Sequence, residues 1–346
     1  MTTGSDPMTS ASTETKASAD APPHQRWLTV LLSLLYPGLG HLYVGKLRRG
    51  VIWFLIPYTA LLLLARPAAL AGWAPLFGLL FFGLAGARLG AALDALRTPP
   101  AHPPRLGCAA LVACVIGFTV FSRLGGVALR FWGLEAFAIP SGAMTPSLIV
   151  GDRIFADKAA YDDASPERGD VALFQFPQDR DKIFVFRVIG LPGDVIEERE
   201  GQLTINGWKV PRCELGEVPH ADAGRSTAAV EFLGPRSYLV MHDASPTSGG
   251  PWRVRPGEYF VIGDNRSHSY DARAWGGDGA VPRDHFVGRA LHLWWSTTPG
   301  GAVRMDRVGM DVATTALPPD MLQLGPALER CLASRPSPEA ATPPPP

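Results

Sequence analysis

Four apolar segments lie close together in the first part of this chain and constrain its fold more than any other feature. They are residues 27–44, 51–65, 73–93 and 106–122, the last with flanking residues up to Trp132. A helix that crosses a membrane needs about 20 predominantly apolar residues. Pro37-Gly38 interrupts the first segment and predicts a helix break with close packing at the glycines. We therefore expect three to four transmembrane α-helices, depending on whether 27–44 crosses.

Basic residues beside these segments predict their orientation. They cluster in two connecting loops, with Lys46, Arg48 and Arg49 in one and Arg97 and Arg105 in the other. Cytoplasmic loops carry an excess of Lys and Arg. The last segment should then run outward, so that everything after about residue 130 lies on the non-cytoplasmic side. Arg123 and Arg130, at the expected outer end, oppose this assignment.

The pattern changes after Phe137. Short runs such as VALFQF, YFVIGD and ALHLWWS, rich in β-branched and aromatic residues, are separated by Gly, Pro and Asp up to about Val312. Such spacing predicts a compact, mostly β domain. The expected organisation is a disordered tail over 1–25, a transmembrane region over 26–132, the β domain over 133–312 and a Pro-rich disordered tail over 313–346.

Charge and cysteine content exclude some classes of function. The chain has 32 basic and 32 acidic residues, so its formal net charge of zero gives no electrostatic case for a nucleic-acid partner. Its four cysteines are Cys108, Cys114, Cys213 and Cys331. None has metal-ligand spacing, and they suggest no disulfide framework. We interpret Cys108 and Cys114 as small apolar filler, and we expect no metal and no cofactor.

Three motifs follow one another in the second half of the chain. The first is FAIPSGAMTPSLIVGDRIFADK (137–158), the second joins RGDVALFQFP to KIFVFRVIGLPGDVIE (168–197), and the third is YFVIGDNRSHSYDARAWGGDGAVPRDHFVGRALHLWWS (259–296). Their order and spacing resemble the type I signal peptidase (leader peptidase) family. The resemblance covers roughly residues 130–310, about half of the chain. Several separate motifs in the right order make it highly specific.

The resemblance implies a location, an activity and partners. Members of that family are anchored in the bacterial cytoplasmic (inner) membrane with a β domain on the outer, periplasmic side, and they remove signal peptides from exported preproteins. A neutral lysine takes the proton of a nucleophilic serine, and a second serine with a backbone N–H stabilises the oxyanion. The implied partners are signal peptides or exported preproteins, the lipid bilayer, and an active signal peptidase or the export machinery.

Both members of the catalytic dyad are replaced in this chain. The family pattern Pro-Ser-Gly-Ser-Met places the nucleophile directly before Met, where this chain has Ala143. The second pattern, Lys-Arg-Val-x-Gly-Leu-Pro-Gly-Asp, places the base directly before Arg, where this chain has Phe186. A methyl group cannot attack a carbonyl, and a phenyl ring cannot carry a proton. The expected catalytic residues are therefore absent.

The other family positions persist, so the resemblance assigns roles to several residues. Ser141 and the backbone N–H of Ala143 match the oxyanion positions. The remaining matches are three apolar pocket positions, a serine that orients the lysine and a structural ion-pair set: Phe137, Ile139 and Val185; Ser269; and Arg187, Asp264, Asp271 and Arg273. Ala272 departs from the usual serine, which we expect to be minor.

Neighbouring groups are poor substitutes for the lost dyad. Ser141 lies two residues from the vacated position, about 6.6 Å along an extended strand, whereas a nucleophile must come within about 3–3.5 Å. Lys182 lies about 13 Å from position 186 on the same strand face. Thr145 and Ser147 are constrained by Pro146, and Lys158 matches an ordinary family lysine. His268 is the one imidazole near the expected site, and the simpler interpretation of it is a polar loop residue without a catalytic role.

Three interpretations follow from these residues. The first is a catalytically silent signal-peptidase homologue that binds signal peptides or exported chains and regulates or assists an active enzyme. The second is an active peptidase with a displaced nucleophile or base, for example Ser141. The third is a non-enzymatic membrane assembly protein whose β domain is a docking surface.

Overall fold

The computed structural model describes residues 23–97, 108–131, 133–220, 224–245, 247–276 and 279–346. The chain divides into two compact units, the first formed by Met1–Pro57 with Leu84–Phe121 and the second by Tyr58–Gly83 with Ser122–Pro346. Of the tail predicted over 1–25, residues 1–22 lie outside the described residues, and Pro23 already begins a helix.

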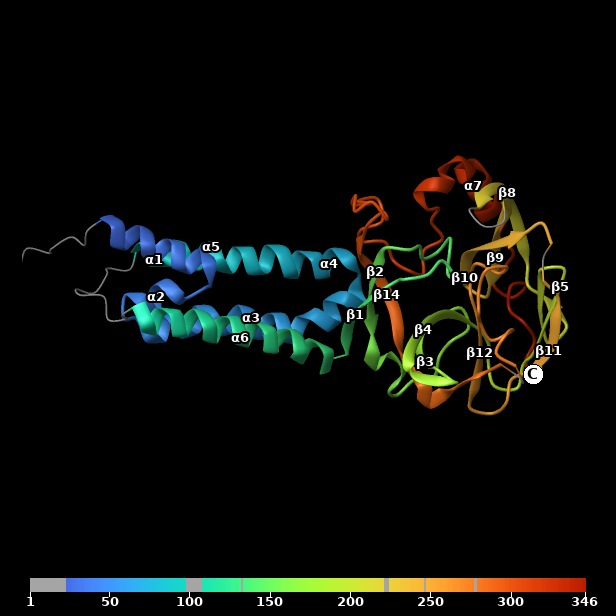
Figure 1. Ribbon diagram of the computed structural model, residues 1–346, viewed down its shortest axis with the longest axis horizontal. Helices are drawn as coiled ribbons and strands as arrows, with labels where there is room; N and C mark the ends of the chain where they lie inside the picture. Colours follow the sequence, from blue (N-terminus) through green and yellow to red (C-terminus); the bar gives the residue numbers. More distant parts are fainter. Residues whose placement is uncertain (1–22, 98–107, 132, 221–223, 246, 277–278) are drawn as a thin grey trace, which may run out of the picture. The chain divides into compact units, whose positions relative to one another are not determined.

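The first part of the chain is helical, as the apolar segments predict (Figure 1). Its helices are α1 (Pro23–Leu35), α2 (Leu39–Tyr43), α3 (Leu47–Ala71), α4 (Trp73–Phe77), the π-helical turn η1 (Gly78–Gly83), α5 (Leu84–Arg97) and α6 (Cys108–Phe131). Within the described ranges, two stretches are long and apolar enough to cross a membrane, Leu47–Ala71 and Trp73–Arg97. Helix α6 has 24 residues, whereas α1 has 13 and α2 has 5.

Glycines allow α2 to approach its neighbours closely in the first unit. A Cβ atom on Gly40 would lie 2.0 Å from the carbonyl oxygen of Thr29 in α1. A Cβ atom on Gly38, whose φ is +90°, would lie 2.1 Å from the carbonyl oxygen of Gly50 in α3. Any larger residue at either position would push the helices apart. The close packing predicted at these glycines is confirmed.

The second unit contains a mostly β domain built from three antiparallel sheets (Figure 1). The large sheet has the order β1-β2-β14-β3-β4-β12-β13, and the smaller ones have the orders β10-β9-β8 and β11-β5-β6-β7. The bounds are β1 Leu134–Ala138, β2 Asp152–Asp157, β3 Val171–Phe176, β4 Asp179–Gly190, β5 Val195–Arg199, β6 Gln202–Ile205, β7 Trp208–Lys209, β8 Arg212–His220, β9 Gly224–Leu233, β10 Arg236–Asp243, β11 Gly249–Arg253, β12 Glu258–Ile262, β13 Val281–Pro282 and β14 Phe286–Ser296. Short 3₁₀ turns occupy Lys158–Tyr161 (η2) and Arg283–His285 (η3).

The main core of this domain lies on the large sheet. Strand β3, VALFQF, is buried at five of its six positions, because both faces of the strand are covered. Strand β4 is exposed where it begins and buried from Phe186 to Gly190. Residue pairing places Phe186 opposite Ala172 of β3. The buried half of β4 therefore carries Phe186 and Arg187 into the interior.

The C-terminal end of α3 and the turn to α4 also belong to the second unit and contact the β domain. The Arg66 guanidinium pairs with the Asp157 carboxylate, with Nε to Oδ1 at 3.1 Å. His292 Nε2 lies 2.9 Å from the carbonyl oxygen of Ala69. Ala69, Leu76 and Leu134 form a small buried apolar cluster. The ends of two apolar helices and the β domain thus share one compact unit.

The C-terminal segment is ordered, so the disorder predicted for 313–346 is wrong. Residues Pro319–Leu324 form a 3₁₀ turn (η4), and Gly325–Ala333 form helix α7. Leu328 and Cys331 of this helix, with Met321 and Leu324 of η4 just before it, are buried against the apolar face of sheet β8-β9-β10. The Pro-rich composition of the segment did not indicate the apolar face of this helix. Pro326 lies in the first turn of the helix, where a backbone N–H has no intrahelical partner to bond.

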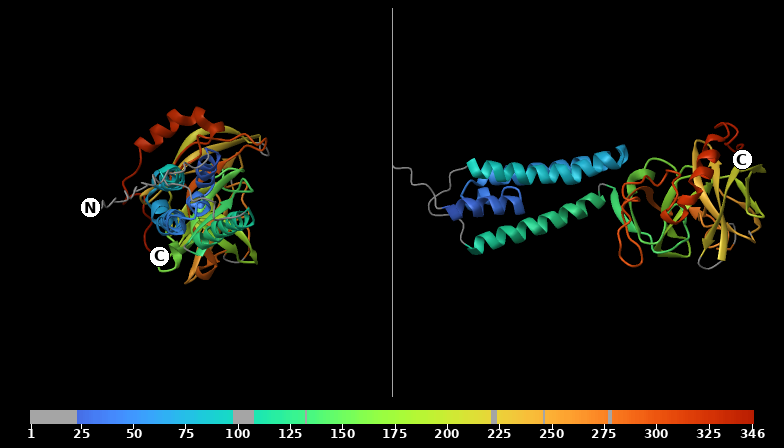
Figure 2. Two further views of the ribbon diagram at one scale, coloured as in Figure 1. Left: turned by 90° about the vertical axis from the view of Figure 1, so that its left-hand side faces the viewer. Right: turned by 90° about the horizontal axis from the view of Figure 1, so that it is seen from above.

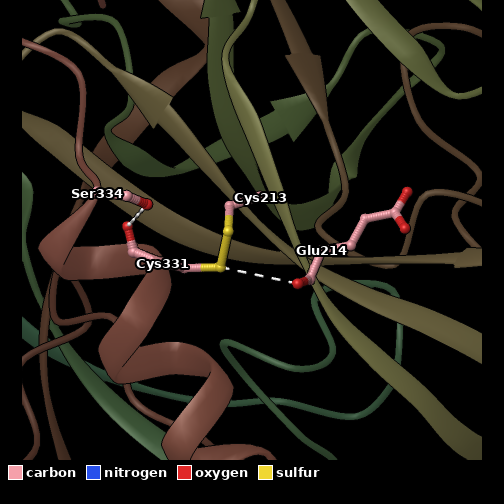
Figure 3. The surroundings of a disulfide bond; sticks show 4 residues. All are labelled: Cys213, Glu214, Cys331 and Ser334. Carbon is pink, nitrogen blue, oxygen red and sulfur yellow. Dashed lines mark hydrogen bonds between the residues drawn. A yellow bond between two sulfur atoms is a disulfide. The ribbon is translucent and has the colours of Figure 1, made fainter.

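A disulfide bond holds the segment in place, which corrects the expectation of no disulfide framework. Cys331 of α7 is bonded to Cys213 of β8, 118 residues away in sequence (Figure 3). The chain then continues along the domain, where Gly234 N donates to the Ala341 carbonyl and Asn206 Nδ2 donates to that of Pro344. Figure 2 shows the red helix α7 beside the yellow strands of sheet β8-β9-β10. Cys114 is a free, half-buried thiol.

We predict that reduction destabilises the β domain. A disulfide that closes a loop of this length contributes about 2–5 kcal/mol, mainly by restricting the unfolded chain. Thermal unfolding of the full chain in detergent should therefore begin at a lower temperature when reductant is present. The variant Cys213→Ser/Cys331→Ser should unfold at that lower temperature whether or not reductant is added. A wild-type midpoint that reductant leaves unchanged would contradict this role of the bond.

Candidate functional site

A cavity of about 650 Å³ lies where the first two motifs meet the third. Three parts of the chain line it: residues 137–145, residues 183–186 of β4, and Asn265, His268 and Tyr270. Its volume falls within the range of small-ligand and peptide pockets. Motifs that are far apart in the sequence therefore converge on one concave surface.

The loop after β1 is fixed in this cavity by backbone contacts. Asn265 donates to it twice, from its backbone N to the Ala143 carbonyl at 3.1 Å and from Nδ2 to the Gly142 carbonyl at 3.1 Å. A Cβ atom on Gly263 would lie 2.5 Å from the Ala143 carbonyl oxygen. Glycine is therefore needed at 263, because a larger residue would displace the loop that carries Ala143.

Phe186 occupies the position beside this loop as an aromatic core residue. Its side chain is 5% exposed, and its ring packs at centroid distances of 5.9–6.3 Å from those of Phe174, Phe184 and Trp275. Such tilted and edge-on pairs add to the stabilisation that comes from burying the rings. This face of the cavity is thus an apolar aromatic wall without a titratable group.

A buried hydroxyl lies next to the Ala143 loop. A Cβ atom on Gly263 would lie 2.2 Å from Ser269 Oγ and 2.5 Å from the Ala143 carbonyl oxygen, so both flank the same point. Ser269 Oγ is buried, and among the described residues it has no hydrogen-bond partner. An unsatisfied buried polar group costs about 1–3 kcal/mol. The buried Ser269 hydroxyl is thus an unfavourable feature of this part of the cavity.

A buried ion pair connects β4 to the third motif. Arg187 donates from Nε and Nη2 to the two oxygens of Asp264, at 2.8 and 2.7 Å, and from Nη1 to the Gly169 carbonyl at 3.0 Å. The guanidinium also lies 4.2 Å from the ring centre of Tyr238. Burial opposes its charge, but the Asp264 carboxylate outweighs that effect and raises the pKa of Arg187 above its ordinary value. Arg187 thus stays charged.

A second ion pair supports the loop of the third motif. Asp271 accepts from Arg273 Nε at 2.9 Å and from Gly263 N at 2.9 Å. Arg273 extends this network to Glu198 Oε2, at 2.9 Å from its Nη1. Ala272, which stands where the family pattern usually has serine, is buried in this loop. Asp271 therefore fixes the backbone of Gly263, which lies next to the Ala143 carbonyl.

The structure brings most of the predicted site residues together. Ser141, Phe137, Ile139 and Val185 all line the cavity with Ala143 and Phe186. The lysines do not line it: Lys182 Nζ pairs with Asp179 at 2.7 Å, and Lys158 Nζ pairs with Glu135 at 2.9 Å.

Sequence reasoning missed several residues of the cavity. Ile183, Phe184, Asn265 and Tyr270 also line it. Asn265 lies inside the GDN part of the third motif, which was a usable signal, whereas the other three were visible only as strand or loop residues. Also missed was the contact of His268 with Asp243, where Nε2 and Oδ2 lie 2.8 Å apart.

The comparison with known proteins decides the family. A family model described as "Signal peptidase, peptidase S26" matches residues 108–295, which is more than half of the chain. This chain belongs to the signal peptidase (peptidase S26) family. The C-terminal segment over 319–346, which contains the disulfide-bonded Cys331, lies beyond the matched region of the family.

Two relatives, from Pseudomonas fluorescens and Leptolyngbya laminosa, agree with this membership. The chain is 36% identical over 191 residues to signal peptidase I of Pseudomonas fluorescens, covering 49% of this chain and 67% of the relative. It is 30% identical over 211 residues to signal peptidase I of Leptolyngbya laminosa, covering 58% and 88%. A crystal structure of a signal peptidase I from Enterococcus faecalis V583 aligns at 25% identity over 36% of this chain and 97% of that chain, with a TM-score of 0.23.

We predict that Arg187→Met strongly destabilises the β domain, because it leaves the Asp264 carboxylate buried without a counter-charge. Removing one partner of such a pair costs about 3–5 kcal/mol. The double variant Arg187→Met/Asp264→Leu should regain part of this loss. Urea unfolding in detergent measures both.

The matched control is Arg199→Met, since Arg199 is 81% exposed in its pair with Glu197. An exposed pair contributes at most about 1 kcal/mol, so this variant should unfold close to wild type. Equal stability of Arg187→Met and Arg199→Met would refute the role given to the buried pair.

Proposed function

We propose that this chain is a membrane-bound signal peptidase homologue that binds signal peptides or exported preproteins in the cavity and does not cleave them. The observation that carries the proposal is that Ala143 and Phe186 stand at the nucleophile and base positions and line the same cavity. The Ser269 hydroxyl beside them, buried and without a partner among the described residues, supports the loss of a lysine from this site.

The size of the chemical loss favours binding over cleavage. Removing the nucleophile of a serine protease lowers turnover on the order of 10⁶-fold, and an oxyanion site with substrate binding retains roughly 10³–10⁴-fold over water. Ser141 is exposed in the cavity, the Ala143 N–H remains, and the apolar positions Phe137, Ile139 and Val185 are in place. The hydroxyl and the N–H form hydrogen bonds with an extended peptide, and the apolar positions contact small apolar side chains of that peptide.

The proposed location is the bacterial cytoplasmic membrane, with several crossings and the β domain on the outer side. The C-terminal end of α3, next to the turn between the two long apolar stretches, contacts the β domain through Arg66–Asp157 and His292–Ala69. That turn and the domain would then lie on one side, opposite the basic residues Lys46, Arg48 and Arg49. The Cys213–Cys331 disulfide agrees with an oxidising compartment such as the periplasm.

The experiment that tests the proposal is a cleavage assay in detergent with a preprotein that carries an Ala-x-Ala site. We predict that the wild-type protein leaves the preprotein intact and that Ala143→Ser/Phe186→Lys cuts it at that site. The double variant restores a hydroxyl and an amine on a scaffold that already holds the oxyanion and pocket groups.

The single variants Ala143→Ser and Phe186→Lys are the controls, because each lacks half of the dyad and should stay silent. Cleavage by wild type, in a preparation freed of contaminating peptidase, would overturn the proposal. A silent double variant that still folds would show that the cavity is not a usable signal-peptide site.

A second candidate, an active peptidase with displaced groups, is favoured by one specific contact. His268 lines the cavity with Ser141, and its Nε2 lies 2.8 Å from Asp243 Oδ2. A carboxylate that orients an imidazole near a hydroxyl is the arrangement that activates a serine in other hydrolases. If wild type cleaves, Ser141→Ala and His268→Ala should each abolish turnover; full activity in both would exclude these residues.

A further inference from the structure

A second cavity of about 360 Å³ adjoins the first one. Thr145 lines both cavities, so they meet at the loop that follows Ala143. The chain segments that line them are also bonded to each other. Met241 of β10 lines the second cavity, Asn265 lines the first, and the neighbouring Arg266 N donates to the Met241 carbonyl at 2.9 Å. The two cavities are therefore neighbouring parts of one surface.

The C-terminal segment builds one wall of this second cavity. Pro319, Asp320 and Met321 of η4 line it, opposite Ile149 and Val150 of the loop. Helix α7 follows η4 directly and is bonded through Cys331 to Cys213. The family match ends at residue 295, so this wall comes from a part of the chain outside the matched family region. The disulfide fixes the position of the wall.

The lining of the second cavity is mostly apolar, with one acidic and one basic side chain whose charges oppose each other. Met241 and Met321 are buried, and Val150 is 44% exposed. Arg304 also lines it, but its Nη1 is occupied by the carbonyl oxygens of Val150 and Thr297, at 3.0 and 2.8 Å. Asp320 is exposed at the rim. Such a site accepts an aliphatic or proline side chain and disfavours an acidic one.

The order of residues along the loop indicates which part of a peptide reaches this site. The apolar pocket positions Phe137 and Ile139 precede Ala143, whereas Thr145, Ile149 and Val150 follow it. A peptide that places its signal-peptide end against 137–139 and crosses Ala143 in extended form continues toward Thr145. Successive residues of an extended chain advance by about 3.3 Å, so a few residues suffice to enter the second cavity.

We infer that the second cavity, walled by the C-terminal segment, binds an apolar side chain of the exported chain just downstream of its signal peptide. This inference rests on the proposed function, because it uses the same peptide and the same cleft. It makes the disulfide-bonded segment a determinant of which exported chains are bound.

The test compares two fluorescent peptides that bind the full chain in detergent. The short peptide ends at the Ala-x-Ala site, and the long one continues for ten residues with leucine or proline after the site. We expect the long peptide to bind about tenfold or more tightly, since burying an aliphatic side chain contributes that much. Val150→Lys should remove this advantage and leave the short peptide unaffected.

The matched control is Val303→Lys, since Val303 is 41% exposed, similar to Val150, and lines neither described cavity. It should bind both peptides like wild type. Cys331→Ser, which frees the wall without changing a lining residue, should also reduce the advantage of the long peptide. An acidic residue in place of the downstream leucine should weaken binding beside Asp320.

The outcomes separate the inference from the proposed function. Equal binding of both peptides to wild type overturns the inference and leaves the proposed function standing. A long-peptide advantage that persists in Val150→Lys and Cys331→Ser also overturns it, because the contact then lies elsewhere. Failure of both peptides to bind overturns the proposed function, and the inference with it.

Discussion

The buried pair of Arg187 and Asp264 is the interaction on which the geometry of the cleft depends. It joins β4, which carries Phe186, to the segment Gly263–Asn265, which bonds the Ala143 loop. The attraction between two buried charges offsets their desolvation only when the geometry is close and the remaining donors are satisfied, as they are here. The pair therefore keeps Ala143 and Phe186 on one surface.

A phenylalanine at position 186 is compatible with a stable fold for a simple physical reason. A lysine at position 186 would place an amine among Phe174, Phe184 and Trp275, where charge is costly. A phenyl ring in the same place adds apolar contacts instead. What remains unfavourable is the buried Ser269 hydroxyl, which has no partner among the described residues. The site thus combines a well-packed aromatic wall with this unsatisfied hydroxyl.

Much of the cleft was predictable because its residues lie in contiguous motifs. Local sequence motifs alone were enough to place Ser141, Ala143, Phe186 and Arg187. The β character of 137–312 followed from the alternation of strand-forming runs with turn residues. The His268–Asp243 contact was not predictable, because its two residues come from separate elements and only the fold brings them together.

The C-terminal segment shows the limit of composition as a guide. Its many prolines suggested disorder, but nine residues around Leu328 form a helix whose apolar face packs against the apolar face of sheet β8-β9-β10. The disulfide could not be read from spacing, since Cys213 and Cys331 are 118 residues apart and no local motif pairs them. Tertiary contacts, rather than local preference, order this part of the chain.

The most direct measurement of the central claim is recovery of a bound peptide from the wild-type protein. A labelled signal peptide with an Ala-x-Ala site is allowed to bind, the complex is isolated in detergent after several hours, and the mass of the released peptide is determined. The account predicts saturable binding that an excess of unlabelled peptide abolishes, and release of the peptide at its full mass. Recovery of two fragments that meet at the Ala-x-Ala site, or no saturable binding at all, would contradict it.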